Sequence, residues 1–251
     1  MATSRRFALI PDSISGRMQA VFDRLIMRTP AGRIEFFDLD DFPWIADIES
    51  RADDIRAELD TLLADVERLP NFQDIQEEQK SLTHDDLWKV VLFYAYGERF
   101  DENCRMCPRT VEAVDAIPDM VTAMFSVMLP DKHIPPHTGP WKGVLRYHLA
   151  LRTPADESSA GIRVGTTTRH WENGRSMIFD DTFEHEAWNK SDEIRVVLFV
   201  DVVRPLPWYL DKPNRAFIAA IRRSPFIKRA LAKSDAWQET LGAATSPDGR
   251  G

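Results

Sequence analysis

Between Ala123 and Val203 the sequence alternates short β-type runs with turn signals, and this pattern limits the possible folds more than any other feature. The runs are FSVML, VLRYHLAL, GIRVGTTTRHW, SMIFDD and RVVLFVDVV. Short strands at such spacing are typical of a β-sandwich or barrel. Asn173-Gly174, which stands between two of the runs, predicts a β-hairpin there. We therefore expect a mainly β core.

Helical patterns flank this core. Residues 44–69 carry apolar side chains at intervals of three and four, which predicts a helix, and residues 109–116 predict a short helix that ends near Pro118. Residues 85–95 fit a helix or a strand, and the helical pattern returns after Pro205. We expect a single domain over residues 1–251, made of a helical part at 1–120, the β core at 121–205 and a basic helical tail at 206–251.

Charge and hydropathy exclude two classes of protein. The chain has 251 residues, with 32 Lys or Arg and 40 Asp or Glu, so its formal net charge is −8. A general basic field for nucleic acid is therefore absent. No apolar run approaches the ~18 residues that a membrane span needs, and the apolar stretch at 7–10 is too short for the core of a signal peptide. We expect a cytoplasmic protein.

Positive charge nevertheless gathers near the C-terminal end. Residues 204–233 hold eight basic residues and one acid, with aromatic and aliphatic residues between them. A basic amphipathic helix of this kind can lie on an anionic membrane surface, here the inner membrane. The alternative is a helical tail that folds onto the core with its arginines solvated, and charge runs are more often of that second kind.

Two of the expected strands carry arginine on a face that should point inward. In VLRYHLAL, Arg146 and His148 share one face because side chains alternate along a strand. In RVVLFVDVV, Arg195 shares a face with Val197, Phe199 and Asp201. An inward-facing arginine is costly unless an anion pairs with it, and its planar fork suits a carboxylate. The pair predicts a pocket for a small dianion. The alternative for each arginine is a structural salt bridge with an acid.

Histidines concentrate in the same part of the chain. Five of the six lie between residues 133 and 185. His137 stands just before the Arg146 strand, and His185 stands ten residues before Arg195. Neutral imidazoles are good ligands for Fe(II). A single histidine is more often an ordinary core or surface residue, so the prediction of a metal site depends on the arrangement.

Residues 88–212 resemble the aspartyl/asparaginyl β-hydroxylase family of Fe(II)- and 2-oxoglutarate-dependent oxygenases, whose bacterial relatives include lipid A hydroxylases. The resemblance is densest in FSVMLPDKHIPPHTGPWKGVLRYHLAL and WENGRSMIFDDTFEHEAWNKSDEIRVVLFVDVVRPLP. It implies a double-stranded β-helix, a cupin-like jelly roll, with flanking helices. It also implies that the protein is a dioxygenase that uses Fe(II), O₂ and the cosubstrate 2-oxoglutarate.

The resemblance extends to individual positions. His137 and His185 match the two iron-binding histidines of the family. Arg146 and His148 match residues that hold the 1-carboxylate of 2-oxoglutarate. Ser126 and Arg195 match residues that hold its 5-carboxylate. These implied roles agree with the same-face argument, which uses no resemblance.

Position 139 departs from the usual ligand set. Most oxygenases of this fold bind iron through two histidines and one carboxylate, and the carboxylate normally stands two residues after the first histidine. Here that residue is Gly139, which cannot ligate. Animal members of the family share this gap, with water completing the iron shell, and Asp181 matches an acid thought to hold such a water. The alternatives are a turn or cap role for Asp181 and a halide ligand at the gap.

The resemblance implies hydroxylation of an unactivated C–H bond, coupled to conversion of 2-oxoglutarate to succinate and CO₂. We expect the β-carbon of an Asp or Asn side chain, in a peptide or a carrier-bound amino acid, because of the gap at Gly139. An acyl chain of lipid A or a similar membrane lipid is the alternative, which the basic tail and the modest chain length favour. A non-catalytic jelly-roll sensor or binding protein is a third candidate, but neither ligand histidine has been lost.

Cys104 and Cys107 form a CxxC and are the two cysteines of the chain. A thioredoxin-like redox pair would sit in a βαβ setting that is absent here, and half a zinc site would need a partner chain. We therefore expect two structural thiols or a local disulfide.

The remaining histidines and the tryptophans near the motif receive simpler interpretations. We expect His133 at the rim of the site and His170 on a strand surface. Trp141, Trp171 and Trp188 are expected to pack the barrel edges, and Trp141 is also a candidate for the mouth of the substrate site.

Overall fold

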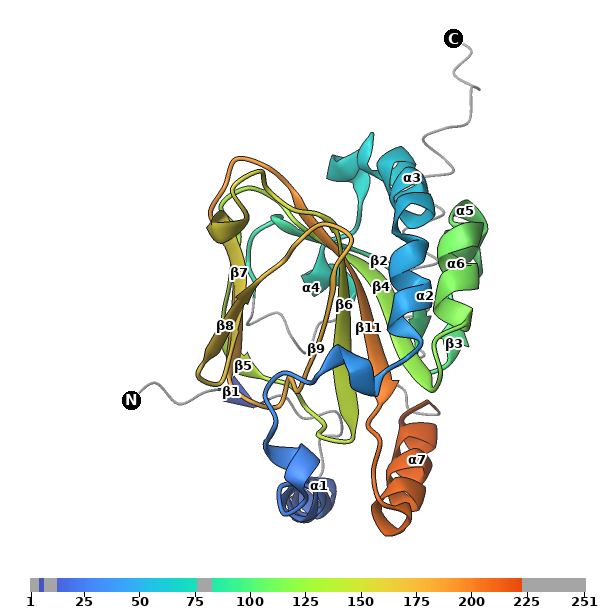
Figure 1. Ribbon diagram of the computed structural model, residues 1–251, viewed down its shortest axis with the longest axis vertical. Coiled ribbons are helices and arrows are strands. Elements are labelled where there is room, and N and C mark those ends of the chain that lie inside the picture. Colours follow the sequence, from blue (N-terminus) through green and yellow to red (C-terminus); the bar gives the residue numbers. More distant parts are fainter. Residues whose placement is uncertain (1–4, 7–12, 76–82, 223–251) are drawn as a thin grey trace.

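Two facing sheets form the centre of the protein in the computed structural model, which describes residues 5–6, 13–75 and 83–222 (Figure 1). Strand pairing is antiparallel except between β1 and β5. The five-stranded sheet has the order β1 (Arg5–Arg6), β5 (His133–Thr138), β10 (His185–Asn189), β7 (Ala160–Val164) and β8 (Thr167–His170). The six-stranded sheet has the order β3 (Glu98–Arg99), β2 (Trp88–Ala95), β4 (Met120–Met128), β11 (Arg195–Val203), β6 (Val144–Arg152) and β9 (Ser176–Phe179). From β4 to β11 the chain passes repeatedly from one sheet to the other, which confirms the double-stranded β-helix.

Helices cover the outer face of the six-stranded sheet, where α2, α3, α5 and α6 lie together (Figure 1). The helix predicted at 109–116 is confirmed as α6, and the one predicted at 44–69 is divided into α2, α3 and η3. The α-helices are α1 (Ser13–Ile26), α2 (Ile45–Ser50), α3 (Ala52–Leu63), α4 (Phe72–Ile75), α5 (Asp101–Met106), α6 (Pro108–Asp115) and α7 (Trp208–Arg222). The 3₁₀ turns are η1 (Pro30–Arg33), η2 (Leu39–Asp41), η3 (Val66–Arg68) and η5 (Glu157–Ser159).

The strand system begins earlier than the sequence pattern predicted. Trp88–Ala95 is strand β2 and pairs with β4, so the expected helical part at 1–120 is wrong over this stretch. Every residue of β2 is buried. A strand buried on both faces carries a continuous apolar run, whose periodicity does not distinguish it from a helix.

The hairpin predicted at Asn173-Gly174 is also wrong. β8 pairs with β7 in one sheet, and β9 pairs with β6 in the other. The two residues do form a tight turn: Gly174 has φ +75°, and the N–H of Arg175 donates to the carbonyl oxygen of Glu172 at 2.9 Å. The turn is a local property of these residues, whereas the strands on either side of it find their partners through packing elsewhere.

Alternation along β6 and β11 divides their side chains between two cores. Leu145, Tyr147 and Leu149 of β6 pack beneath the helices, together with Leu198 of β11. Residues of opposite parity, such as Phe199, face the space between the sheets. This confirms that Arg146, His148 and Arg195 project from one face, into the interior of the jelly roll.

The C-terminal tail starts as predicted with a helix, α7, but its first arginine does not belong to a solvated or membrane-facing surface. Arg204 is fully buried, pairs with Asp180, and donates from Nε to the carbonyl oxygen of Lys142 at 2.7 Å. Residues 223–251 lie outside the described part of the chain. None of the helices in the described ranges combines the length and the apolar character that crossing a bilayer requires.

Candidate active site

Two histidines from adjacent strands face each other inside the jelly roll. β5 and β10 pair so that His137 stands opposite His185, with their ring centroids 4.1 Å apart. Nδ1 of His137 lies 2.8 Å from the carbonyl oxygen of Pro135, and Nδ1 of His185 lies 3.0 Å from that of Phe183. A carbonyl oxygen can only accept, so both Nδ1 atoms carry the proton. In each neutral ring Nε2 therefore carries the lone pair that a metal needs.

Burial keeps both rings neutral. Removal from water, together with the nearby cation of Arg146, lowers the pKa of His185 to about 3. Burial and the neighbouring His185 lower the pKa of His137 well below its usual range. Metal binding requires deprotonated imidazole, so both rings are in the binding form at neutral pH.

Arg195 carries a buried charge with no acid beside it among the described residues. Its side chain is 2% exposed, and its guanidinium lies 4.3 Å from the ring centroid of Trp171. One Nη donates to the carbonyl oxygen of Ser126 at 3.3 Å, and the other contacts the sulfur of Met128. Nε has no hydrogen-bond partner in the part of the chain that the structure describes. Desolvation lowers the pKa of Arg195 to about 9. A bound anion would relieve that cost.

Two further donors point into the same space. Nδ1 of His148 accepts from Nε1 of Trp171 at 3.4 Å, so Nε2 carries the proton in the neutral ring. This N–H is buried and has no partner among the residues that the structure describes. Burial and the cation of Arg195 lower the pKa of His148 well below its usual range. Oγ of Ser126 accepts from Nε1 of Trp88 at 3.1 Å, which leaves its own proton available for donation.

We call this space the inner chamber and define it by Ser126, His137, His148, Trp171, His185 and Arg195. It brings together both predicted iron ligands and the four residues predicted to hold 2-oxoglutarate, with Arg146 at its boundary. Trp171 was expected at the barrel edge, and that prediction is wrong: the indole is buried inside the chamber, between His148 and Arg195.

Arg146, the fourth of those residues, already has two acidic partners. Nη2 of Arg146 lies 2.9 Å from Oδ2 of Asp181, and Nε donates to Oδ1 of Asp201 at 3.0 Å. The alternative of a structural salt bridge with an acid is therefore correct for Arg146 and wrong for Arg195 within the described residues. Sequence reasoning placed Asp201 on the Arg195 strand but missed its ion pair, because β11 and β6 bring the two residues opposite each other only in the folded sheet.

Asp181 lies in the connection between β9 and β10, beside position 139. The N–H of Gly139 donates to the carbonyl oxygen of Asp181 at 2.7 Å. Oδ2 of Asp181 pairs with Arg146, whereas Oδ1 is buried and has no partner among the described residues. The same part of the chain holds no group of three or more His, Cys, Asp or Glu residues that could hold a metal ion. The protein side chains thus offer a metal two histidines, and Asp181 offers acceptors for a water molecule.

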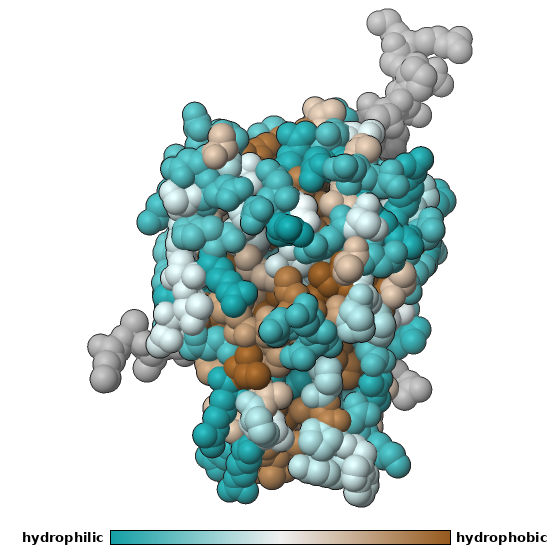
Figure 2. All heavy atoms as spheres, in the orientation of Figure 1, coloured by the Kyte–Doolittle hydropathy of each residue, from teal (hydrophilic) through white to brown (hydrophobic). Residues whose placement is uncertain are grey.

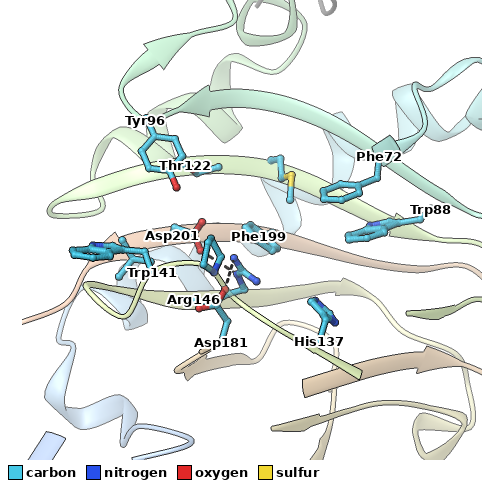
Figure 3. A pocket seen from close by; sticks show the side chains of 13 residues that line it. Phe72, Trp88, Tyr96, Thr122, His137, Trp141, Arg146, Asp181, Phe199 and Asp201 are labelled. Carbon is cyan, nitrogen blue, oxygen red and sulfur yellow. Dashed lines mark hydrogen bonds and ion pairs between the residues drawn. The ribbon is translucent and has the colours of Figure 1, made fainter. Parts of the chain in front are cut away.

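An outer chamber adjoins the inner one at His137 and Arg146 (Figure 3). Phe72 and Trp88 stack at one end with ring centroids 3.7 Å apart. We define the outer chamber by these two rings together with Tyr96, Thr122, Trp141, Asp181 and Asp201. Figure 3 shows Tyr96, Thr122 and Trp141 gathered at the other end, with Arg146 and its two acids between the ends.

Sequence reasoning found Trp141 as a mouth candidate and missed Tyr96 and Thr122. Thr122 shares a strand face with Ser126 in MVTAMFSVM, so alternation could have indicated it. Oγ1 of Thr122 is buried without a hydrogen-bond partner in the described residues. The outer chamber therefore combines an aromatic end with a polar end that can accept or donate.

The other sequence candidates lie away from both chambers. His133 is exposed and pairs with Glu186 at 2.9 Å. His170 lies on a strand surface as predicted, with Nδ1 at 2.9 Å from the carbonyl oxygen of Ala160. Cys104 and Cys107 are free and buried, which confirms structural thiols and excludes the local disulfide.

Comparisons of the sequence with known proteins find similarity to hydroxylases. A sequence profile of the Aspartyl/Asparaginyl beta-hydroxylase family matches residues 49–205. The ornithine lipid ester-linked acyl 2-hydroxylase of Rhizobium tropici is 42% identical over 212 residues, which are 84% of this chain and 75% of that protein. The human aspartyl/asparaginyl beta-hydroxylase is 33% identical over 133 residues, which are 51% of this chain and 17% of the human protein. Among solved structures, the cupin domain of Schizosaccharomyces pombe Cnp3 aligns with 55% of this chain and 77% of its own, at 12% identity and a TM-score of 0.35.

Proposed function

The chain belongs to the aspartyl/asparaginyl β-hydroxylase family, and from that premise we propose that it is an Fe(II)- and 2-oxoglutarate-dependent hydroxylase. One observation carries the proposal: Arg195, buried and without an acid beside it in the described residues, shares a chamber with two imidazoles whose Nε2 atoms bear lone pairs. A cation in an apolar chamber fits an anionic cosubstrate, and paired neutral imidazoles fit iron.

His137 and His185 are the residues that would hold the metal, through Nε2. Bound iron would supply the oxidation of a C–H bond at the expense of O₂ and 2-oxoglutarate. Two protein ligands leave positions for the cosubstrate and for water. Asp181 can hold such a water through Oδ1, which has no partner among the described residues, while Oδ2 pairs with Arg146.

The cosubstrate would span the inner chamber. Arg195 and Ser126 would bind one carboxylate through charge and hydrogen bonds, and the Nε2 proton of His148 would bind the other. Arg146 would act mainly through its position, because Asp181 and Asp201 already balance its charge. The stacked rings of Phe72 and Trp88 would give the adjoining outer chamber an apolar end that disfavours water.

For the substrate we propose an acyl chain of an amino-acid-containing lipid, in place of the Asp or Asn side chain that the sequence favoured. Support comes from the extent of the likeness to the ornithine lipid hydroxylase, which spans most of both chains, and from the aromatic lining of the outer chamber. The gap at Gly139 still favours an Asp or Asn side chain, which is the second candidate.

The test is turnover by purified protein loaded with Fe(II), measured as succinate release and as a +16 Da shift in the substrate. One arm contains an ornithine-type acyl lipid in detergent, and the other contains an Asp-containing peptide. Lipid-dependent succinate with a hydroxylated acyl chain supports the proposal. Turnover with the peptide alone would move the assignment to the second candidate, and absence of iron binding would overturn the oxygenase proposal.

A further inference from the structure

Exposed large apolar side chains gather at one end of the protein. Among the residues whose exposure the structure describes, six of the seven lie on α1, in the residues that follow it, and at the start of α7. The seventh, Met106, lies in α5. The six, which we call the apolar end face, are Val21, Leu25, Met27, Ile34, Trp208 and Tyr209.

Both helices occupy the lower end of the view in Figure 1. Figure 2 shows hydrophobic and pale side chains reaching the surface among polar ones at the same end. Trp208 is 74% exposed and Tyr209 is 56% exposed, although aromatic side chains are usually covered in a folded domain. An exposed cluster of this kind marks an interaction site.

The apolar end face adjoins the outer chamber through one side chain. The indole of Trp141 lines that chamber and stacks on Phe22 of α1, with ring centroids 4.9 Å apart, and on Phe217 of α7, at 4.0 Å. Nε1 of Trp141 donates to Oδ1 of Asn214 in α7 at 2.8 Å. The two helices that carry the exposed residues therefore pack against one wall residue of the proposed substrate site.

α1 has two adjacent apolar rows, and only one of them is used for packing. Phe22 and Ile26 face the protein, and Ile26 is completely buried. Val21 and Leu25, which are also four residues apart, are 55% and 40% exposed. A helix needs one apolar row to dock on its own domain, so the second row is available for a partner.

Cations surround the exposed row without acids to balance them. Arg24, Arg28 and Arg33 are exposed, and none of the three forms an ion pair with another residue that the structure describes. Nε of Arg33 donates only to the carbonyl oxygen of Met27. This differs from the remainder of the chain, whose net charge is negative.

The arginines of α7 are different, because they are committed to the protein itself. Arg215 contacts Asp119 at 2.6 Å, and Arg222 contacts Glu98 at 2.9 Å. In the described part of the basic tail, the groups available to contact a surface are therefore the aromatic pair Trp208 and Tyr209 more than the arginines.

We propose that the apolar end face docks on an anionic lipid bilayer, with Val21, Leu25 and Trp208 in the interface and the arginines of residues 24–33 against the head groups. Aliphatic residues flanked by arginine, together with exposed Trp and Tyr, are the composition of helices that lie in a bilayer interface. A protein partner would need matching acids over this mixed surface, whereas anionic lipid supplies charge and apolar depth together. This docking rests on the proposed function, because it would bring the enzyme to a membrane that contains the proposed lipid substrate.

The test is co-sedimentation of the full chain with vesicles of phosphatidylglycerol and phosphatidylcholine, or of phosphatidylcholine alone. We expect binding to the anionic vesicles, at least tenfold weaker binding for the double variant Leu25→Glu/Trp208→Glu, and wild-type binding for Met106→Glu. The last variant places one such charge outside the face, on an apolar residue whose exposure, 43%, is close to the 40% of Leu25. Arg24→Glu/Arg28→Glu should also weaken binding at least tenfold, with a salt dependence lower than that of the wild type.

The outcome is separable from that of the proposed function. Wild-type protein that hydroxylates detergent-dispersed lipid but does not bind vesicles would overturn the docking inference alone. Vesicle binding without turnover of any lipid would overturn the lipid substrate alone. Equal loss of binding in Met106→Glu, or binding by all variants, would also contradict the inference, because the contact would then not reside on this face. Circular dichroism of each variant distinguishes lost docking from lost folding.

Discussion

The carboxylate of Asp181 occupies the space that any side chain on Gly139 would need. A Cβ placed on Gly139 would lie 2.1 Å from Oδ2 and 2.2 Å from Cγ of Asp181. Asp181 is 1% exposed and is held by Arg146, so it has no room to withdraw. The absence of a third protein ligand at position 139 is therefore part of the packing, in which an acid from the β9–β10 connection takes the place of a side chain.

Gly139→Asp should not create a three-ligand centre. The added carboxylate would meet Asp181 in a buried space, and overpacking of this kind costs roughly 1–3 kcal/mol. We expect a lower free energy of unfolding in urea and a loss of 2-oxoglutarate turnover. Gly174→Asn is the matched control, because nothing lies within 4 Å of a Cβ at Gly174 and Asn tolerates its positive φ. Wild-type stability of Gly139→Asp would contradict the packing argument.

His137→Ala and His185→Ala should each abolish binding of Fe(II) and succinate release. Each variant removes one of the two imidazoles that face each other across β5 and β10. Metal content per chain and succinate assays measure the two effects. His170→Ala is the control, since this histidine lies on a strand surface, where it contacts the backbone of Ala160 and the ring of Trp188. Full iron occupancy in either site variant would refute the assignment.

Arg195→Met should have opposite effects on the free protein and on cosubstrate binding. Removing a buried charge that has no acid beside it in the described residues leaves the unfolding midpoint unchanged or raises it. Losing the charge-assisted hydrogen bonds, worth about 1.5–3 kcal/mol, should raise KM for 2-oxoglutarate about 10- to 100-fold. Arg175→Met, at an exposed arginine beside Glu49, should change neither quantity. An unchanged KM in Arg195→Met would remove Arg195 from the cosubstrate site.

Cys104 and Cys107 should not react with a thiol reagent until the protein unfolds. Both are buried, and desolvation raises the pKa of Cys107 to about 12 and that of Cys104 above its usual value. The thiolate is the reactive form, so the native protein at pH 8 should release no chromophore from a disulfide reagent, and the denatured protein should release two equivalents. Rapid reaction of the native protein would indicate an accessible redox pair.

Arg204→Ala should destabilise the fold far more than Arg222→Ala. The first substitution leaves Asp180 buried and deprived of one partner, a change that typically costs about 3–5 kcal/mol. The second removes an exposed pair with Glu98, worth about 0–1 kcal/mol. Urea denaturation of the two variants measures the difference. Equal stabilities of the two variants would contradict the buried ion pair of Arg204 and would indicate that its side chain is solvated.

Strand alternation is the part of the fold that the sequence predicted best. Arg146 and His148 were placed on one face because successive side chains point to opposite sides of a strand, and Arg195 followed the same rule. The rule failed at Trp88–Ala95, where both faces are buried and alternation disappears. The rule also made no prediction for Trp171, which lies in the connection after β8 and enters the inner chamber from there.

The sequence by itself determined the chemistry that is available: two histidines, arginine on inward faces, and glycine where a carboxylate ligand usually stands. These properties are local, because residue type and the period of a strand do not depend on the rest of the chain. Only the tertiary structure decided which of these groups meet. It paired His137 with His185 through the register of β5 and β10, gave Arg146 two acids and left Arg195 with none among the described residues. Such pairings join segments tens of residues apart, and they are fixed by the packing of two sheets and not by the sequence around each residue.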